Sequence, residues 1–383
     1  MKRRVVILTE IIAPYRIPVF NALAARSDVE SHIIFLSETD PSLRQWYVYK
    51  DEIKFSYEIL RGWRRRLGKY NLLVNVGIGA ALRRARPEVI ISGGYSYLAS
   101  WQAALWAERN KVPLLLWCES NSADKRRKHA LVESLKKRFR GMCRAFVAAG
   151  LASRGYLLEL GAPEGSVFVA PDAVDVEMYA RSAARARARC AELRAEHSLP
   201  QRYFLYVGRL VEEKGVFDLL SAYAKLDESA RTRIGLVFVG DGAVRADLVG
   251  RASQIHTGVI RFCGWVHREQ ISELYALAEA LVFPTHSDPW GLVVNEAMAC
   301  GLTIVASDVA GCVADLVRSG ENGFTFRPRD IDGLVDAMRT LINQPDLAKR
   351  MGNCSFELIR AHTPEACAAG FATAVNFACE GMA

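Results

Sequence analysis

The stretch that most constrains the fold occupies residues 283–301 and reads FPTHSDPWGLVVNEAMACG. Phe283 ends the apolar run Ala280–Phe283, which predicts a buried strand, and residues 292–300 predict a helix. The loop between them is interrupted by proline and glycine. A helix that starts directly after such a loop points unpaired backbone N–H groups at it and favours anions there. Two carboxylates flank this position, Asp288 in the loop and Glu296 about one turn inside the helix.

A second charged loop follows the predicted strand 203–207. Arg209 and Lys214 lie in this loop; a guanidinium can fork onto a diphosphate, and a lysine adds a point charge. Two cations, a helix N-terminus and two carboxylates in one half of the chain suit the phosphates and hydroxyls of a nucleotide sugar. Taken singly, Arg209 could be a solvated surface residue and Asp288 a turn residue before Pro289, so the prediction rests on the whole set.

Short β-branched runs alternate with helical stretches along the chain. Val5–Leu8 opens one such series and Tyr203–Val207 opens a second. This alternation predicts an α/β fold in which parallel sheets carry helices on both faces. The runs end in glycine or small polar residues, which leaves room for a ligand at the carboxyl edge of each sheet. A turn-rich break at Pro171–Asp175 separates the two series.

Composition narrows the class of protein. The 383 residues are 51% apolar, which is an ordinary globular composition and enough chain for two domains. The longest apolar runs fall well short of the length needed to span a membrane. Nine dispersed cysteines include no Cys-x-x-Cys pair, which predicts reduced thiols and a cytoplasmic location.

The net charge of +8 is unevenly distributed. Residues 1–172 hold 28 Lys and Arg against 16 Asp and Glu, whereas the remainder holds 22 against 26. Two basic clusters stand out, Arg61–Tyr70 and Lys125–Lys128, the second followed by Lys136–Arg140. Interleaved aromatic residues suit an anionic membrane surface or an anionic lipid substrate, and a solvated face remains an alternative. Since no nucleic-acid-binding module accompanies the clusters, we expect no nucleic-acid partner.

Other chemistries lack their signatures. Asp330 and Asp332 form the only Asp-x-Asp pair, at an expected helix start, so we interpret them as capping residues. Histidine and cysteine show no metal-ligand spacing, and we expect no metal. No Gly-x-Ser-x-Gly supports a serine hydrolase, and Gly240-Asp-Gly242 is not a full dinucleotide fingerprint, which makes a Rossmann oxidoreductase the least favoured class.

Several motifs together resemble the retaining glycosyltransferases of family 4. The matching segments are Val207–Leu210 with Glu213–Gly215, Val239–Gly242, Phe262–Gly264, Asp288–Gly301 and Gly320–Phe324. The resemblance implies the GT-B architecture, two Rossmann-like domains with parallel sheets facing across a cleft. We therefore expect an acceptor-binding domain at 1–172, a nucleotide-sugar-binding domain at 173–365, and a C-terminal helix at 366–383 that crosses back to the first domain.

The resemblance also implies roles for individual residues. Arg209 and Lys214 would hold the donor diphosphate and stabilise the leaving nucleotide, and Asp288 would contact the donor sugar. The remaining donor-binding positions would be Gly208, Gly240, Gly291, Leu292, Val293 and, for the ribose, Glu296. Such enzymes as a rule need no metal or other cofactor, and the donor would be a UDP- or GDP-sugar. Retention would proceed by front-face attack.

Three departures from the family pattern concern the substrates. Asp288 stands where the family has a glutamate, which is one methylene longer. Residues 12–16 replace the Gly-Gly loop that many members carry after the first strand, and a frequent histidine is absent near Trp117–Ser120. The acceptor site is therefore assigned only to Tyr15, Arg16 and Glu119.

These observations predict a metal-independent retaining hexosyltransferase. Its acceptor would be anionic or lipid-linked, such as a polyprenyl-diphosphate saccharide in surface polysaccharide or glycolipid synthesis. The enzyme would then be peripheral on the inner face of the cytoplasmic membrane. Two alternatives stay open: transfer to a soluble natural product or sugar, and a nucleotide-sugar-binding protein without catalysis.

Overall fold

The structure is a computed structural model that describes residues 2–40, 47–67, 70–123 and 130–380. The chain divides into two compact units, each with its own core. Unit 1 comprises Met1–Val174 together with Pro364–Ala383, and unit 2 comprises Asp175–Thr363. The sequence placed the corresponding boundaries after residues 172 and 365.

Unit 1 is built on a seven-stranded sheet in the order β3-β2-β1-β6-β7-β8-β9, in which every pairing is parallel. Its strands are β1 Arg3–Thr9, β2 Val29–Phe35, β3 Ser56–Ile59, β6 Val89–Ser92, β7 Leu114–Cys118, β8 Ala145–Ala148 and β9 Val167–Val169. The strand order reverses between β1 and β6, because the chain builds outward from β1 in one direction and then in the other. Open α/β sheets bind ligands at the carboxyl ends of the strands at such a switch point.

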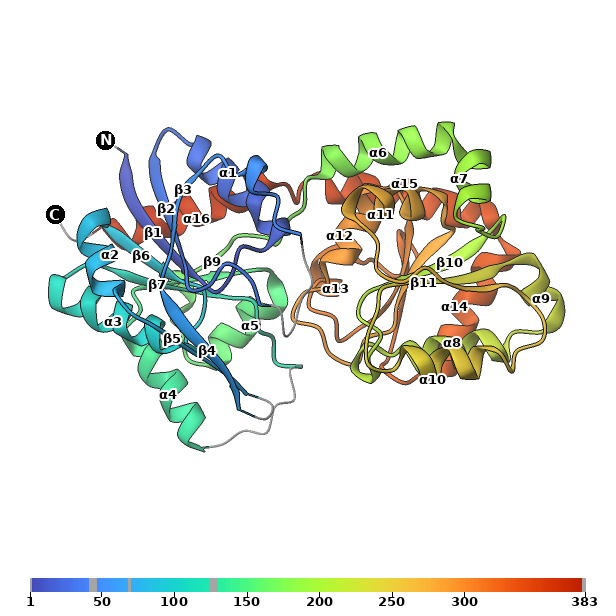
Figure 1. Ribbon diagram of the computed structural model, residues 1–383, viewed down its shortest axis with the longest axis horizontal. Helices are drawn as coiled ribbons and strands as arrows, with labels where there is room; N and C mark the ends of the chain where they lie inside the picture. The colour runs from blue at the N-terminus through green and yellow to red at the C-terminus, as the bar shows by residue number, and fades with distance from the viewer. Residues whose placement is uncertain (1, 41–46, 68–69, 124–129, 381–383) are drawn as a thin grey trace. The chain divides into compact units, whose positions relative to one another are not determined.

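Helices cover both faces of this sheet (Figure 1). They are α1 Ile17–Ala25, α2 Ile78–Ala85, α3 Leu98–Asn110, α4 Ala130–Gly141, α5 Leu151–Glu159 and α16 Pro364–Cys379. Alternation along β1 divides the core: Val5 and Ile7 pack toward α1 and α16, whereas Val6 and Leu8 pack toward α2 and α3. Both faces are therefore buried, as the continuous β-branched run predicted.

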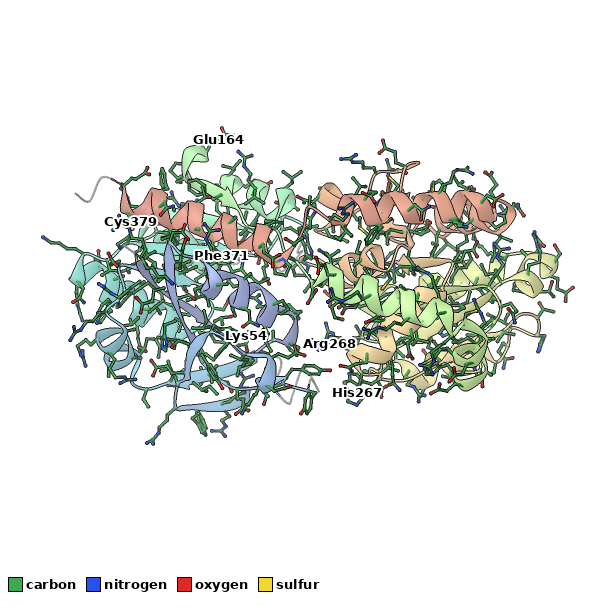
Figure 2. All side chains as sticks on the ribbon, turned by 90° about the horizontal axis from the view of Figure 1, so that it is seen from above. Lys54, Glu164, His267, Arg268, Phe371 and Cys379 are labelled. Atoms are coloured by element: carbon green, nitrogen blue, oxygen red, sulfur yellow. The ribbon has the colours of Figure 1, made fainter. Side chains whose placement is uncertain are left out.

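Helix α16 is an integral part of unit 1, although the rest of that unit ends at Val174. Phe371, which lies along this helix in Figure 2, packs edge-on against Trp117 of β7 at a centroid distance of 4.9 Å. Ala372 and Val375 are buried in the same core. The chain thus leaves unit 1, builds the whole of unit 2, and returns to complete the first core.

The first basic cluster forms a β-hairpin in unit 1. Strands β4 Gly62–Leu67 and β5 Tyr70–Asn75 pair antiparallel, separate from the main sheet. Trp63 is 56% exposed, and the Arg65 guanidinium lies over its ring. The sequence pattern did not predict these strands. The cluster Lys125–Lys128 lies outside the described residues.

Unit 2 contains a six-stranded parallel sheet in the order β12-β11-β10-β13-β14-β15. Its strands are β10 Tyr203–Val207, β11 Gly235–Val239, β12 Ile260–Phe262, β13 Ala280–Phe283, β14 Thr303–Ser307 and β15 Gly323–Phe326. The predicted bounds of β10 and β13 are confirmed. These two strands are neighbours and mark the point where the strand order reverses.

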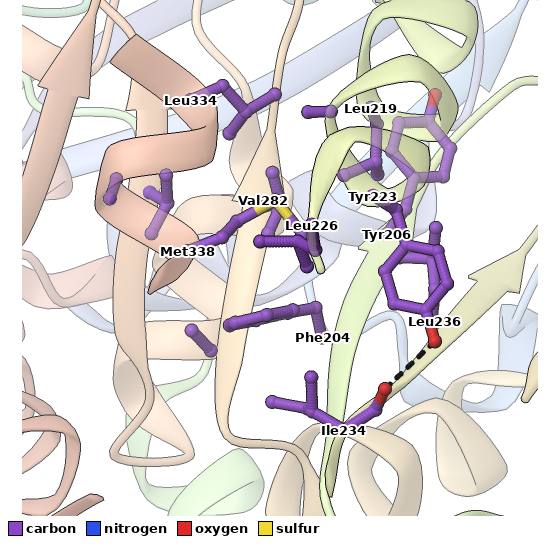
Figure 3. Packing of buried hydrophobic residues seen from close by; sticks show 14 of the residues in the cluster. Phe204, Tyr206, Leu219, Tyr223, Leu226, Ile234, Leu236, Val282, Leu334 and Met338 are labelled. Carbon is purple, nitrogen blue, oxygen red and sulfur yellow. Dashed lines mark hydrogen bonds between the residues drawn. The ribbon is translucent and has the colours of Figure 1, made fainter. Parts of the chain in front are cut away.

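The helices of unit 2 also lie on both faces of its sheet. They are α6 Val176–Ala188, α7 Cys190–Glu196, α8 Val216–Lys225, α9 Glu228–Arg233, α10 Arg245–Ala252, α11 Arg268–Leu277, α12 Leu292–Ala299, α13 Val313–Leu316, α14 Ile331–Asn343 and α15 Pro345–Ile359. Figure 3 shows one core layer, in which Phe204 of β10 packs among α8 and α14 side chains such as Leu219 and Met338. The predicted α/β class with two Rossmann-like halves is confirmed. Among the described residues, we find no helix long and apolar enough to cross a membrane.

Candidate functional site

The charged loops predicted from the sequence come together at the switch point of unit 2. The loop after β10 carries Arg209 and Lys214, and the loop after β13 carries Asp288. Because β10 and β13 pair in parallel, both loops leave the same edge of the sheet. The Lys214 ammonium donates to Asp288 Oδ2 over 2.6 Å and to the carbonyl oxygen of Ser287 over 3.1 Å.

Backbone contacts hold these two loops together. The backbone N–H of His286 donates to the carbonyl oxygen of Glu213 over 2.8 Å. Gly215 has a φ of +67°, and a Cβ there would lie 1.9 Å from the carbonyl oxygen of Pro284. Only glycine permits this approach. The spacing between Lys214 and Asp288 is thus fixed by main chain as well as by their ion pair.

Arg209 differs from Lys214 in its surroundings. Its side chain is exposed, and within the described ranges it forms no ion pair or hydrogen bond. Its carbonyl oxygen accepts from the buried Tyr206 hydroxyl over 2.8 Å, so the backbone under the guanidinium is fixed. A cation held at a sheet edge without a partner can accept an anionic ligand without first breaking an ion pair.

Two of the predicted donor-binding glycines pack against each other. Gly208 follows β10 and Gly240 follows β11, the next strand of the sheet. Gly240 has a φ of +126°, and a Cβ there would lie 2.0 Å from the carbonyl oxygen of Gly208. This backbone contact alone requires glycine at 240, and it leaves the edge beside Arg209 free of side chains at both positions.

Helix α12 begins directly after Gly291, with Leu292 and Val293 in its first turn. Backbone N–H groups of a first turn have no partner within the helix. The start of the helix is fixed by Trp290, whose indole Nε1 donates to Asn295 Oδ1 over 2.9 Å. Asp288 Oδ1 accepts from the Trp290 N–H over 3.2 Å, so the loop carboxylate is tied to the same start.

Glu296 lies one turn into α12 and is held by two phenols. The Tyr275 hydroxyl donates to Glu296 Oε2 over 2.8 Å, and the Tyr179 hydroxyl also hydrogen-bonds this carboxylate. Burial raises the pKa of the Glu296 carboxyl, while the two tyrosines and Arg268 act in the opposite direction. Arg268 begins α11 and is labelled, beside His267, in Figure 2.

The predicted acceptor residues lie at the carboxyl edge of the unit 1 sheet. Arg16, after β1, forms an ion pair with Glu119, after β7. The Arg16 guanidinium also lies 4.0 Å from the centre of the Trp117 ring and 5.7 Å from that of Tyr15. The structure therefore brings all three acceptor candidates together around one guanidinium.

Asp172 joins this cluster and was not among the predicted site residues. It is buried, and burial together with the nearby Glu119 raises the pKa of its carboxyl well above the usual value, whereas Arg16 acts against that rise. Two carboxylates thus share one guanidinium. A second pairing at the same edge joins Arg64 to Glu10 and Asp40.

A metal site is not assembled in the part of the chain that the structure describes, where no group of three His, Cys, Asp or Glu side chains could hold an ion. The interpretation of Asp330 as a capping residue is confirmed, since its side chain accepts from the Gly333 N–H over 2.9 Å at the start of α14.

Sequence reasoning missed the partners of the charged residues. Tyr179 and Tyr275 reach Glu296 from two other helices, and Asp172 reaches Arg16 from another strand end. No local sequence pattern identifies these residues, because an isolated tyrosine in a predicted helix is interpreted as part of the hydrophobic core. His286 is a partial exception: it lies inside the loop quoted first, and its Nε2 is 2.7 Å from Asp218 Oδ2.

Parallel sheets in two Rossmann-like units, with a polar switch point in the second, define the GT-B class of fold. Residues 191–357 match the family described as "Glycosyl transferases group 1". The matched segment spans most of unit 2 and includes Arg209, Lys214, Asp288 and Glu296.

Two curated relatives each resemble less than half of the chain. A glycogen synthase of Mycobacterium tuberculosis is 36% identical over 149 residues, which are 38% of this chain and 35% of that protein. O-antigen chain mannosyltransferase B of Escherichia coli is 32% identical over 194 residues, 46% of this chain and 50% of that protein. The chain thus spans between a third and a half of the length of these relatives.

Structural likeness extends over both units. The crystal structure of HepE from Anabaena in complex with UDP matches with a TM-score of 0.76 and 16% sequence identity, covering 98% of this chain and 100% of that one. At this identity the match concerns the fold. It shows that unit 1, which the family match does not include, belongs to the same architecture.

Proposed function

We propose that the protein is a metal-independent retaining glycosyltransferase that moves a hexose from a nucleoside diphosphate sugar to an acceptor. The observation that carries this proposal is the edge of unit 2, where Lys214 pairs with Asp288 and Arg209 stands exposed beside them. The two cations and the helix start suit the phosphates of such a donor, and the two carboxylates suit its hydroxyl groups. The match of residues 191–357 to the group 1 glycosyl transferases supports the same class of reaction.

The residues divide the donor between them. Arg209 and Lys214 bind the diphosphate, where charge accumulates as the sugar–phosphate bond breaks, and fixed cations stabilise that charge. Asp288 orients the sugar hydroxyls, and Glu296 accepts from the ribose. In a retaining reaction the attacking hydroxyl approaches the face that the nucleotide leaves, so a departing phosphate oxygen can accept its proton.

A uracil base is the first candidate for the donor. HepE was crystallised with UDP and with UDP-glucose, and its fold matches this chain throughout. GDP is the second candidate, as for many mannosyl donors, and an O-antigen mannosyltransferase is among the relatives. Neither likeness extends to the identity of the sugar.

A thermal-shift panel tests the donor site directly. UDP, GDP and ADP at millimolar concentration, followed by their sugars, should raise the unfolding midpoint for one base above the other two, because a ligand that binds the folded state stabilises it. The same panel with Lys225→Ala serves as a control, since Lys225 is an exposed cation on α8. If none of the nucleotides shifts the midpoint, the proposed function is wrong.

For the acceptor we propose a lipid-linked, anionic saccharide at the inner face of the cytoplasmic membrane. Exposed apolar side chains lie beside basic ones on two elements of unit 1. They are Trp63 and Arg65 on β4, and Val132, Leu135, Lys137 and Arg138 on α4. This combination suits an anionic lipid surface, and the O-antigen relative supports surface polysaccharide synthesis as the context.

Vesicle flotation tests the membrane component. Vesicles containing anionic lipid should carry the protein at low salt and release it as ionic strength rises. Trp63→Ala with Arg65→Ala should weaken flotation, whereas Arg360→Ala, an exposed charge loss in unit 2, should not. Absence of flotation, with transfer to a free saccharide retained, would favour a soluble acceptor. Donor binding without transfer to any acceptor would favour a non-catalytic nucleotide-sugar-binding protein.

A further inference from the structure

Glu296 is hydrogen-bonded by two tyrosines whose side chains are almost fully buried. Tyr275 is 0% exposed and Tyr179 is 5% exposed. Both hydroxyls hydrogen-bond the same carboxylate, Tyr275 over 2.8 Å. Neither residue carries a charge, so the carboxylate gains two donors without a counter-ion.

The hydrogen-bonding capacity of a carboxylate explains why this arrangement leaves a site open. Its two oxygens together accept about four hydrogen bonds. Two phenols use half of that capacity and, by fixing two directions, fix the plane of the carboxylate. The remaining acceptor positions can receive two neighbouring hydroxyl groups, such as the vicinal diol of a ribose. An arginine or lysine partner would instead neutralise the charge that makes these hydrogen bonds strong.

The surrounding charges favour the same conclusion. Burial penalises the ionised form of Glu296 and raises the pKa of its carboxyl, whereas the phenols and Arg268 favour ionisation. Cys300, at the far end of α12, is the other titratable group that interacts with it. The two tyrosines, together with Arg268, therefore act against the protonation of Glu296 that burial favours.

Separate elements supply the two phenols. Tyr275 lies in the last turn of α11, and Tyr179 lies in the first turns of α6. Both helices pack on each other and on α12. A buried tyrosine hydroxyl needs only one acceptor, and a backbone carbonyl oxygen is enough for Tyr203 and Tyr223. The hydrogen bonds of Tyr179 and Tyr275 to one shared carboxylate are therefore not explained by the needs of their own hydroxyls.

We propose that Tyr179 and Tyr275 are positioning residues that aim the Glu296 carboxylate at the 2′- and 3′-hydroxyls of the nucleotide ribose, and so set the preference of the site for ribonucleotides. This inference rests on the proposed function, because it takes the donor to be a nucleoside diphosphate sugar. It adds two residues, remote in the sequence, that touch neither the sugar nor the phosphates.

Comparison of UDP with 2′,3′-dideoxy-UDP by isothermal titration calorimetry tests the inference. The wild type should prefer UDP by about 10- to 100-fold, because a hydrogen bond to a charged group is strong. Tyr179→Phe and Tyr275→Phe should each weaken UDP binding by about 10-fold while leaving the affinity for dideoxy-UDP unchanged. The double variant should approach Glu296→Gln in showing little preference. In transfer assays, each variant should raise the donor KM and leave the acceptor KM unchanged.

Tyr223→Phe is the matched control. Tyr223 is also a buried helical tyrosine, and its hydroxyl donates to the carbonyl oxygen of Ile234 over 2.9 Å, away from the site (Figure 3). This variant should lose some thermal stability and keep the full preference for UDP. If GDP or ADP binds more tightly than UDP in the thermal-shift panel, that nucleotide and its dideoxy form replace the uridine pair.

The outcomes separate failure of this inference from failure of the proposed function. If the wild type binds no nucleotide, the proposed function fails first. If it prefers the ribonucleotide and both tyrosine variants keep that preference, the tyrosines do not position Glu296. If the tyrosine variants lose equal affinity for UDP and for dideoxy-UDP, the tyrosines have a purely structural role. If the wild type binds both ligands equally well, Glu296 does not bind the ribose hydroxyls. Loss of cooperative unfolding in one variant leaves the other variant to decide.

Discussion

The carboxyl edges of the two sheets use charge in different ways. In unit 1 both arginines near the switch point are committed, Arg16 to Glu119 and Arg64 to Glu10 and Asp40. In unit 2 Lys214 is paired with Asp288. Arg209 stands exposed, and Glu296 is held by neutral phenols.

We infer from this difference that the edge of unit 2 suits a charged ligand and the edge of unit 1 a neutral one. In our proposal, the exposed Arg209 guanidinium is available to a diphosphate, and Glu296, whose hydrogen-bond donors are neutral phenols, is available to a ribose. Unit 1 offers closed ion pairs, whose oxygens and nitrogens suit sugar hydroxyls better than a free phosphate. Any anionic part of the acceptor would then be bound elsewhere, on the hairpin β4–β5 and α4.

Lys214→Ala should give the largest effect. Without this ammonium, charge on the leaving diphosphate is unbalanced and Asp288 loses its partner, so we expect kcat to fall by about 100- to 1,000-fold. Steady-state kinetics with circular dichroism to verify folding would measure it, with Lys225→Ala as the matched cation. Near-normal turnover in the folded variant would show that Lys214 has no role in the reaction. The two sheet edges would then differ less in their use of charge than we infer.

Arg16→Ala should affect stability first. Removing the guanidinium leaves Glu119 and Asp172 close together without a cation, and because the pair is partly buried we expect a cost of up to about 3 kcal/mol. Urea denaturation would measure this loss of unfolding free energy. Arg26→Ala, which breaks a more exposed pair with Asp28 in the same unit, should cost less than about 1 kcal/mol. Equal effects would show that the Arg16 cluster is no more than a surface pair.

Arg209→Ala should show the reverse balance. The free protein should keep its stability, because the side chain has no partner to lose, whereas nucleotide affinity should fall by about 10-fold or more. Titration calorimetry at several salt concentrations would also show a shallower salt dependence. Arg209→Lys should recover part of the affinity. A loss of stability without a loss of affinity would contradict the distinction between the edges.

Asp172→Asn should give the smallest effect, visible only as pH changes. The folded-state pKa of Asp172 is raised above the unfolded value of about 3.9. Its contribution to stability is therefore complete below that value and is lost as pH rises through the folded pKa. The variant should therefore gain stability relative to the wild type as pH rises from acidic to mildly alkaline. A pH-independent difference in urea midpoints would contradict this assignment.

Much of unit 2 follows from local sequence. Strands β10 and β13 were predicted with their observed bounds, because their buried runs end abruptly in glycine or proline. The loops that bear Arg209, Lys214 and Asp288 could be placed at one edge for the same reason, since adjacent parallel strands end together. The meeting of Lys214 with Asp288 was not predicted, as it depends on the contact of Gly215 with Pro284.

Other features could not be predicted because they depend on long-range contacts or because charged residues hide the local pattern. The hairpin β4–β5 was missed because consecutive arginines at 64–66 hide the alternation that marks a strand. The partners of Glu296 lie 117 residues before it and 21 residues before it in the chain, at Tyr179 and Tyr275. Only packing of α6 and α11 on α12 brings them together, and no local rule reports such packing.

The return of the chain to unit 1 has a consequence for synthesis on the ribosome. Helix α16 is made after the whole of unit 2, yet its Phe371 and Val375 complete the core beneath β1 and β7. Unit 2, a continuous segment, can fold as it emerges. Unit 1 must instead wait through 189 further residues, Asp175–Thr363, with an apolar face uncovered. The nascent chain therefore finishes its second half before its first, and chaperone demand should be greatest during that interval.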